Sequence, residues 1–153
     1  MSLLNFKFGY KTIEGTNRLT GEPFVRYYPF LPCKLQSGKK ETAPTEGLLD
    51  SGSDGVVIPM QLAHYLGLDL EEASPMHVVG RAQIERYSSK VTLVLGRGGR
   101  YCTPIHDVEV SVPAEGDTPI ILGRDPVFEL YTVKFIEAEK RFEMDPYVKP
   151  HTR

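Results

Sequence analysis

Apolar residues along this 153-residue chain occur in short runs, and clusters of Gly, Pro, Ser and Asp interrupt them frequently. Short apolar or alternating runs bounded by turn residues are typical of all-β proteins. The pattern predicts strands over 5–13, 24–35, 45–50, 56–58, 76–86, 88–95, 101–112, 119–122, 132–137 and 141–144. We therefore expect an all-β fold.

Proline and glycine positions refine this prediction. A short helix is expected over 59–66, because Pro59 stands at its start and Gly67 lies just past its end. A second short helix is expected over 125–131, with Asp125 as its cap. Proline cannot donate to a β-ladder, so two prolines inside 24–35 confine that strand to an edge or a bulge. Residues 36–44 are predicted as a polar loop.

Length and charge narrow the class of protein. A chain of 153 residues corresponds to about one domain, so 1–153 is expected to form a single unit. A net charge of −2 gives no electrostatic reason to expect nucleic acid or an anionic membrane as a partner. The four histidines and two cysteines match no metal-ligand spacing. Two isolated cysteines favour a cytoplasmic protein, although a bridge between Cys33 and Cys102 remains open.

The candidate chemistry begins at 48–54, Leu-Leu-Asp-Ser-Gly-Ser-Asp. Asp50 would leave an apolar strand and enter a tight loop that contains Ser51, Gly52 and Ser53. Gly52 permits a close backbone approach where a Cβ would clash, and the two hydroxyls lie beside the carboxylate. Such a held carboxylate suits proton chemistry, so Asp50 is the candidate catalytic residue. The alternative is an ordinary Asp-Ser-Gly turn.

Two other short patterns suggest different chemistry. Cys102 and His106 would share one face of a strand, which could indicate a thiol protease, but no orienting Asn is evident. The glycine-rich segment 96–100 superficially suggests a phosphate loop, but no helix follows it. We predict a hairpin turn there instead.

A second segment strengthens the functional interpretation of the Asp50 loop. Residues 119–125, Pro-Ile-Ile-Leu-Gly-Arg-Asp, follow it by some seventy positions. Together the two segments resemble the retropepsin-like aspartic proteases, the single-domain group that includes the retroviral proteases. The resemblance covers 45–144 and implies an acid-protease barrel with a flap hairpin and one or two short helices. Residues 1–44 would then be an N-terminal extension or hairpin, and 145–153 a tail.

The resemblance also implies a function. Members of this group are aspartic endopeptidases that pair as homodimers, so that two copies of Asp50 activate a water between them. The substrate would be a peptide or protein, and no metal, cofactor, nucleic acid or membrane is expected to take part. The alternative is a protease-fold module that binds peptides or other proteins without cleaving them.

Further residues take roles from the resemblance. Ser51 would bond across the two-fold axis, and Asp54 would form a buried ion pair with Arg124 near the substrate cleft. Asp54 would also contact substrate. Ser53 stands where many retroviral enzymes have alanine, and its hydroxyl could donate to the ionised carboxylate and favour that form.

Val79, Gly80 and Arg81 fall where the tip of the flap should be, and they would contact substrate. Retroviral flaps are richer in glycine, so a plain hairpin turn is an equal alternative here. The segment before Asp50 is nearly twice as long as in the retroviral enzymes. It could add a hairpin that widens the dimer contact or narrows the cleft.

Overall fold

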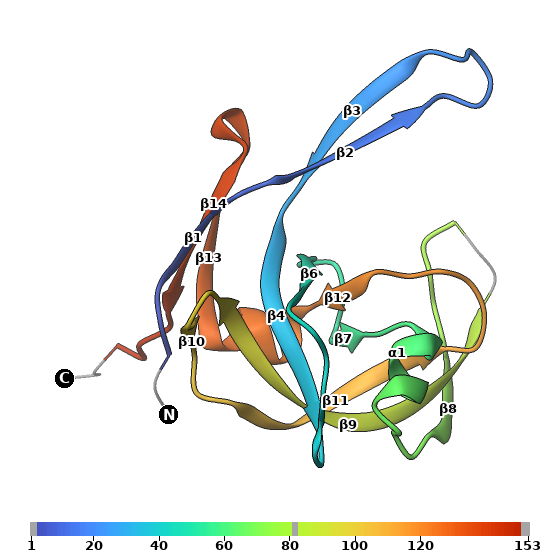
Figure 1. Ribbon diagram of the computed structural model, residues 1–153, viewed down its shortest axis with the longest axis vertical. Coiled ribbons are helices and arrows are strands. Elements are labelled where there is room, and N and C mark those ends of the chain that lie inside the picture. Colours follow the sequence, from blue (N-terminus) through green and yellow to red (C-terminus); the bar gives the residue numbers. More distant parts are fainter. Residues whose placement is uncertain (1–2, 81–82, 151–153) are drawn as a thin grey trace.

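The computed structural model describes residues 3–80 and 83–150 and is built mainly of β-strands (Figure 1). The largest sheet closes on itself as a six-stranded barrel, because β4 pairs with β6 on one side and with β9 on the other. Around the barrel the strands are β9 (Ile84–Arg97), β11 (Ile105–Pro113), β7 (Val56–Val57), β12 (Ile120–Leu122), β6 (Thr45–Leu49) and β4 (Phe30–Ser37). The all-β prediction is confirmed.

Side chains that point into the barrel form its core. Successive residues of a strand point to opposite faces, so every second residue can be buried. Three strands follow this alternation with nearly inaccessible side chains: Leu31, Cys33 and Leu35; Val91, Leu93 and Leu95; Val108, Val110 and Val112. The apolar residues at alternate positions of these strands therefore form their inward faces.

The position of β12 determines the geometry near Asp50. This strand pairs in parallel with β6 and antiparallel with β7, so it lies between them in the sheet. The loop 50–55, which connects β6 to β7, must therefore cross the end of β12. As a result, the two sequence segments that suggested the family meet in space.

A hairpin extends from the long strand β9. Its first strand, β8 (Glu71–Met76), pairs antiparallel with the first part of β9, and the remainder of β9 belongs to the barrel. Val79 and Gly80 lie in the turn, whereas Arg81 lies outside the described residues. Because β9 is shared, this flap hairpin is continuous with the barrel wall.

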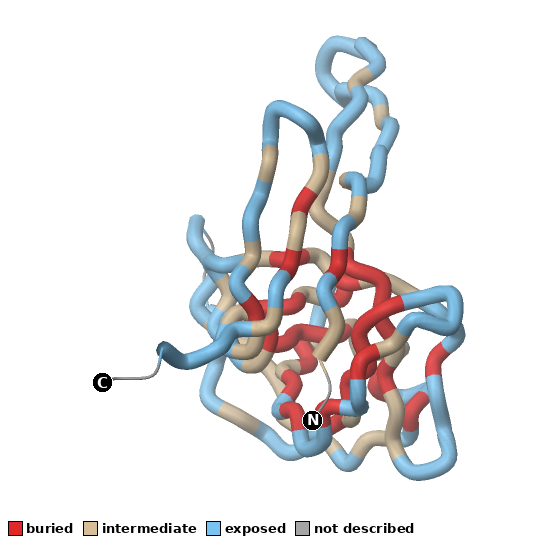
Figure 2. The backbone as a smooth tube through the Cα atoms, turned by 90° about the vertical axis from the view of Figure 1, so that its left-hand side faces the viewer, coloured by how far each residue is buried: buried red, intermediate tan, exposed pale blue. Residues whose placement is uncertain are grey.

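Both chain ends contribute to a second, three-stranded sheet. Its strand order is β1 (Phe6–Gly9), β14 (Arg141–Pro146), β13 (Tyr131–Ile136), and buried Phe6, Phe142 and Met144 connect it to the core. Strands β2 (Lys11–Thr16) and β3 (Pro23–Tyr28) form a separate two-stranded hairpin. Figure 2 shows this hairpin standing away from the barrel, with most of its length exposed.

Short elements complete the fold, and several were predicted. Helix α1 (Met60–Tyr65) follows Pro59, and Gly67 with φ of 65° ends it, as expected. Strands β5 (Lys40–Glu41) and β10 (Arg100–Tyr101) extend the large sheet, and a 3-10 turn spans Glu137–Glu139. The segment 96–100 is a hairpin turn between β9 and β10, as predicted.

Four predicted strands are interrupted. The run 5–13 is divided at Tyr10 between β1 and β2, which belong to different sheets. The run 24–35 is divided between β3 and β4 at Pro29, and 101–112 is broken before Ile105, where Pro104 cannot donate to the ladder. Residues 76–86 are not one strand, because the flap turn lies within them. Apolar periodicity alone does not register such interruptions.

Three further predictions need correction. Strand β4 is not an edge strand throughout, because its pairing with β9 begins at Cys33, just past Pro32, where every residue again has an N–H. The second helix spans Arg124–Phe128 and is followed by two further helical residues, 129–130, so it begins and ends one residue before the predicted 125–131, and Tyr131 already begins β13. Asp125 keeps an extended backbone, with φ of −101° and ψ of 116°, as the residue before a proline favours. The loop 36–44 also contains the short strand β5.

Candidate active site

Asp50 lies directly after β6, and its loop is fixed by hydrogen bonds. Its backbone N–H donates to the Leu122 carbonyl at 3.1 Å, which ties it to the end of β12. Its carboxylate Oδ1 accepts the N–H of Gly52 at 2.9 Å, and its carbonyl accepts the N–H of Ser53 at 3.1 Å. The half-buried carboxylate is thus held in one orientation by its own loop.

Gly52 leaves the Asp50 carboxylate room and does not adopt a positive φ. A Cβ at this position would lie 3.1 Å from Oδ1 of Asp50, tighter than ordinary packing. With a larger residue here, the Asp50 carboxylate would have to shift by a few tenths of an ångström. Ser51 is exposed beside it, where a second molecule could reach its side chain.

Ser53 does not make the contact expected of it. Its hydroxyl donates to the Gly55 carbonyl at 2.9 Å, so its single proton is already directed away from the carboxylate of Asp50. The expectation that Ser53 favours the ionised carboxylate by donating to it is therefore wrong in this structure. The hydroxyl instead closes the loop between Asp50 and β7.

This contact leads to a revised prediction. We expect Ser53→Ala to leave the acid side of the pH–rate profile unmoved, and to lower the free energy of unfolding by about 1 kcal/mol through the lost hydrogen bond. Kinetics across the acid range and denaturant titration would measure the two effects. A clear shift of the acid limb would mean that the hydroxyl turns to the carboxylate when substrate binds.

The segment after β12 packs tightly against the Asp50 loop. The N–H groups of Arg124 and Asp125 donate to the carbonyls of Ser53 and Asp54 at 2.9 and 3.0 Å. A Cβ on Gly123 would lie 2.3 Å from the Gly55 carbonyl oxygen. Two stretches of backbone are therefore in direct contact, and only glycine fits between them.

Asp54 and Arg124 form the predicted ion pair, through Oδ1 and the guanidinium Nη2. The pair is not buried, however: in the single chain 95% of the Asp54 side chain and 56% of the Arg124 side chain are exposed. Both residues lie at the end of the barrel that carries Asp50, and no element of the described chain covers them.

A cavity of about 450 Å³ lies between the Asp50 loop and the flap. It is lined by residues 52–57, by Met76 and His77 at the flap, and by Arg86, Glu109 and Ser111 of the barrel wall. Val79 and Gly80 are fully exposed at the turn of the flap, and Gly80 has φ of 76°. A peptide in this cavity would lie beside the Asp50 loop with the flap on its other side.

Arg86 is the main cavity residue that sequence reasoning missed. Its Nε donates to the Ser74 carbonyl of β8 at 2.7 Å, and its Nη1 donates to Oγ of Ser111 at 2.8 Å. One side chain thus links both flap strands to the barrel. In the sequence, Arg86 could have been singled out only because it lies close to the flap turn. That turn falls inside 76–86, which was predicted as one strand.

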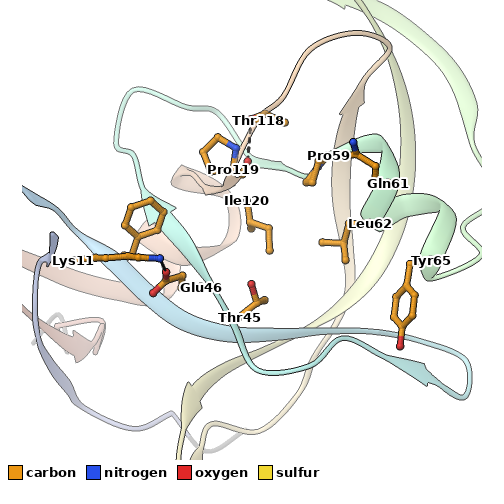
Figure 3. Close-up of a pocket in the computed structure, with 11 residues that line it drawn as sticks. Lys11, Thr45, Glu46, Pro59, Gln61, Leu62, Tyr65, Thr118, Pro119 and Ile120 are labelled. Carbon is orange, nitrogen blue, oxygen red and sulfur yellow. Dashed lines mark hydrogen bonds and ion pairs between the residues drawn. The ribbon is translucent and has the colours of Figure 1, made fainter. Parts of the chain in front are cut away.

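A larger cavity, of about 550 Å³, lies on another side of the barrel. Figure 3 shows apolar side chains of Leu62, Pro119 and Ile120 around it, with Lys11 and Glu46 paired at its rim. Its lining includes none of the predicted site residues. We therefore assign the candidate cleft to the smaller cavity, which Gly52, Ser53 and Asp54 of the Asp50 loop line although Asp50 itself does not.

The thiol alternative finds no support in the geometry. Cys102 is buried and its Sγ accepts the N–H of Leu95, whereas His106 is exposed and lies 3.2 Å from the hydroxyl of Thr92. Burial raises the pKa of the Cys102 thiol, which disfavours the thiolate. The two residues do not share a face, because the strand is interrupted between them.

The structure also settles the possible disulfide. Cys33 and Cys102 flank Leu95 from opposite sides of β9, so their Cα atoms are two strand spacings, about 9–10 Å, apart. A disulfide requires about 7 Å or less. Both cysteines are free, and burial raises the pKa of Cys33 to about 12.

Comparison with known proteins identifies the class that this fold and site define. Residues 32–125 match the family described as aspartyl protease, and because this is more than half of the chain, the protein belongs to that family. Its fold is the retropepsin-like barrel, as the sequence predicted. A search of curated proteins finds no match.

Two solved structures illustrate the likeness. The EIAV protease, solved with the inhibitor HBY-793, is 23% identical with a TM-score of 0.50, over 67% of this chain and 88% of that one. A retropepsin-like aspartic protease from Rickettsia conorii is 12% identical with a TM-score of 0.54, over 90% of this chain and 95% of that one. At these identities the likeness concerns the fold alone. Within residues 3–80 and 83–150, no helix is long and apolar enough to cross a membrane.

Proposed function

We propose that this protein is an aspartic endopeptidase that acts as a homodimer, with Asp50 of each copy as the catalytic pair. The observation that carries the proposal is the loop itself. Asp50 is oriented by Gly52, its loop is tied on the other side to the end of β12, and a peptide-sized cavity opens between the loop and the flap. Membership of the aspartyl protease family supports the same reaction class.

A second copy is needed because one carboxyl cannot play both roles. At a separation of ~3 Å and an effective dielectric near 20, two ionised carboxyls repel by about 5 kcal/mol. That energy corresponds to roughly four pKa units, so the pair holds one proton over a wide pH range. One Asp50 is then a base and the other an acid at the same pH.

The proposed reaction follows from this shared proton. The ionised Asp50 takes a proton from a water, which attacks the peptide carbonyl, while the protonated Asp50 donates to the carbonyl oxygen. When the tetrahedral intermediate collapses, the proton taken from water passes to the leaving amine. The second proton returns from the hydroxyl of the intermediate to a carboxylate, and the pair is ready for another cycle.

A mixing experiment tests the shared site. Wild type and Asp50→Asn chains are unfolded together and refolded at equal amounts, so that about one quarter of the dimers carry two Asp50 residues. We expect cleavage of a peptide library, per total protein, to fall to about one quarter of the wild-type value. Wild type refolded alone is the control. A fall to only one half would mean that each chain works independently.

The alternative function, a module that binds peptides without cleaving them, makes a separate prediction. Pepstatin-type inhibitors resemble the tetrahedral intermediate and need an Asp pair that holds one proton. A protein that binds peptides but neither cleaves them nor binds such an inhibitor would favour the binding module over the enzyme.

A further inference from the structure

The two-stranded hairpin formed by β2 and β3, here called the arm (residues 11–28), has no paired strand outside itself in the described structure. An isolated two-stranded hairpin is only marginally stable in water. The arm also carries four of the ten exposed large apolar side chains in the described chain, namely Ile13, Leu19, Val25 and Tyr27. Such a concentration of apolar surface on one element indicates a contact with another molecule.

The arm begins directly beside the candidate catalytic loop. Phe30 at the start of β4 pairs with Leu48, and the carbonyl of Pro29 accepts the N–H of Leu49 at 3.0 Å. Because β4 runs antiparallel to β6, the chain before Pro29 continues past the end of the barrel where Asp50 lies. The six residues of β3 span about 20 Å in that direction (Figure 1).

The two faces of the arm differ. On one face the Phe24 ring covers Gly15, where an added Cβ would lie 2.5 Å from the ring, and the Arg26 guanidinium lies 4.7 Å from the ring centre. These side chains cover only part of that face, because Ile13, which pairs with Arg26, is 38% exposed on it. On the other face, here called the Val25 face, Val25 is 51% exposed and Tyr27 45%.

A second projecting element lies next to the base of this face. Nζ of Lys140, in the turn between β13 and β14, is 5.8 Å from the Tyr27 ring centre, and the Lys140 carbonyl accepts the N–H of Tyr10. Figure 2 shows the β13–β14 hairpin and the arm extending from the barrel in the same direction. The exposed Asp54–Arg124 pair belongs to the loop at this same end of the barrel.

We propose that the Val25 face of the arm packs against a second copy of this chain and holds the two Asp50 loops together. The inference rests on the proposed function, because the Asp50 site is incomplete without that copy. A two-fold axis beside Asp50 passes close to the base of each arm, so each arm extends over the partner and the contact is made twice. The partner buries Val25 and Tyr27, the two apolar side chains exposed on that face.

The test compares two valines. Val25→Asp places a charge on the proposed contact. Val148→Asp places the same charge on a valine that is 77% exposed and follows the end of β14, the end away from Lys140 and the arm. We expect Val25→Asp to raise the dimer Kd at least tenfold in sedimentation equilibrium, and Val148→Asp to leave it within about twofold. Cleavage by Val25→Asp should recover at high enzyme concentration.

Hydrogen exchange of the wild type provides a second measurement that needs no variant, in case Val25→Asp does not fold. As concentration rises through the dimer Kd, we expect the amides of 24–28 to become more protected. Unchanged protection there would overturn the proposal. An unchanged dimer Kd in folded Val25→Asp would also overturn it, including the case in which only KM rises because the arm contacts substrate.

The outcomes separate this inference from the proposed function. A dimer that depends on Val25 but retains activity in Asp50→Asn would uphold the arm contact and contradict the catalytic role of Asp50. A dimer whose Kd is unchanged by Val25→Asp, together with loss of activity in Asp50→Asn, would contradict the arm contact and uphold the catalytic role of Asp50. A wild type that stays monomeric at all concentrations overturns the arm contact, and if that monomer cleaves peptides it overturns the shared site as well.

Discussion

Replacing Asp50 by Asn should abolish peptide cleavage, with kcat lower by about 10⁴-fold or more, because both the base and the acid of the proposed pair are lost. The substitution keeps the shape of the side chain. Its amide oxygen can still accept the N–H of Gly52, which lies 2.9 Å from Oδ1 of Asp50, so the loop should keep its conformation. The measurement is single-turnover cleavage of a peptide library across pH 3 to 8, a range that brackets carboxyl titration.

The same variant should keep its fold and its assembly. Removing a pair of carboxyls that repel each other relieves the electrostatic cost of bringing two loops together, so the dimer Kd should stay equal or fall. Thermal unfolding and sedimentation equilibrium would check both quantities. Residual cleavage at a rate close to that of the wild type would place the chemistry on another residue.

Gly123→Ala should have the second largest effect, through the backbone of the site rather than its chemistry. The new Cβ would lie 2.3 Å from the Gly55 carbonyl oxygen and 2.5 Å from that of Ser53. Neither is a flexible side chain, so the loop must move and the Arg124 N–H to Ser53 hydrogen bond of 2.9 Å must lengthen. We expect a loss of about 2–4 kcal/mol in the free energy of unfolding.

Gly9→Ala provides the matched control for this prediction. Its added Cβ would meet only the Lys140 carbonyl, at 4.0 Å, and neither glycine has a positive φ. The free energy of unfolding should change by less than about 0.5 kcal/mol. Denaturant titration would measure both variants, and cleavage assays should show a loss only in Gly123→Ala. Equal losses in the two proteins would mean that the close approach at Gly123 is relieved at little cost.

Much of the fold could be predicted from local pattern. The alternation on β4, β9 and β11, the turn at Gly67 and the glycine-rich hairpin after β9 all follow from rules that act over a few residues. The errors fall where one run of similar composition contains a turn, as in 76–86. Apolar periodicity measures which face is buried, and it cannot by itself locate a reversal of the chain.

The residues of the candidate site can also be divided into those that the sequence predicted and those that it did not. Asp50, Gly52 and the segment ending in Gly123 could be recognised because each carries a local chemical signature, and two signatures in order support one another. The hydroxyl of Ser53 and the side chain of Arg86 could not be assigned. The partners of Arg86, Ser74 and Ser111, are set by a strand pairing and register that the sequence does not specify. The Ser53 hydroxyl bonds the Gly55 carbonyl within its own loop, and residue type alone does not say which nearby oxygen it takes.

The sequence by itself determined the class of fold, the loop that presents Asp50 and the segment that packs beneath it, because these depend on side-chain type and short-range backbone geometry. Only the tertiary structure decided that the arm continues past the Asp50 end of the barrel, that its Val25 face is uncovered and that the Asp54–Arg124 pair is exposed. Exposure and direction depend on which distant strands pair, and the order of residues along the chain does not fix that pairing.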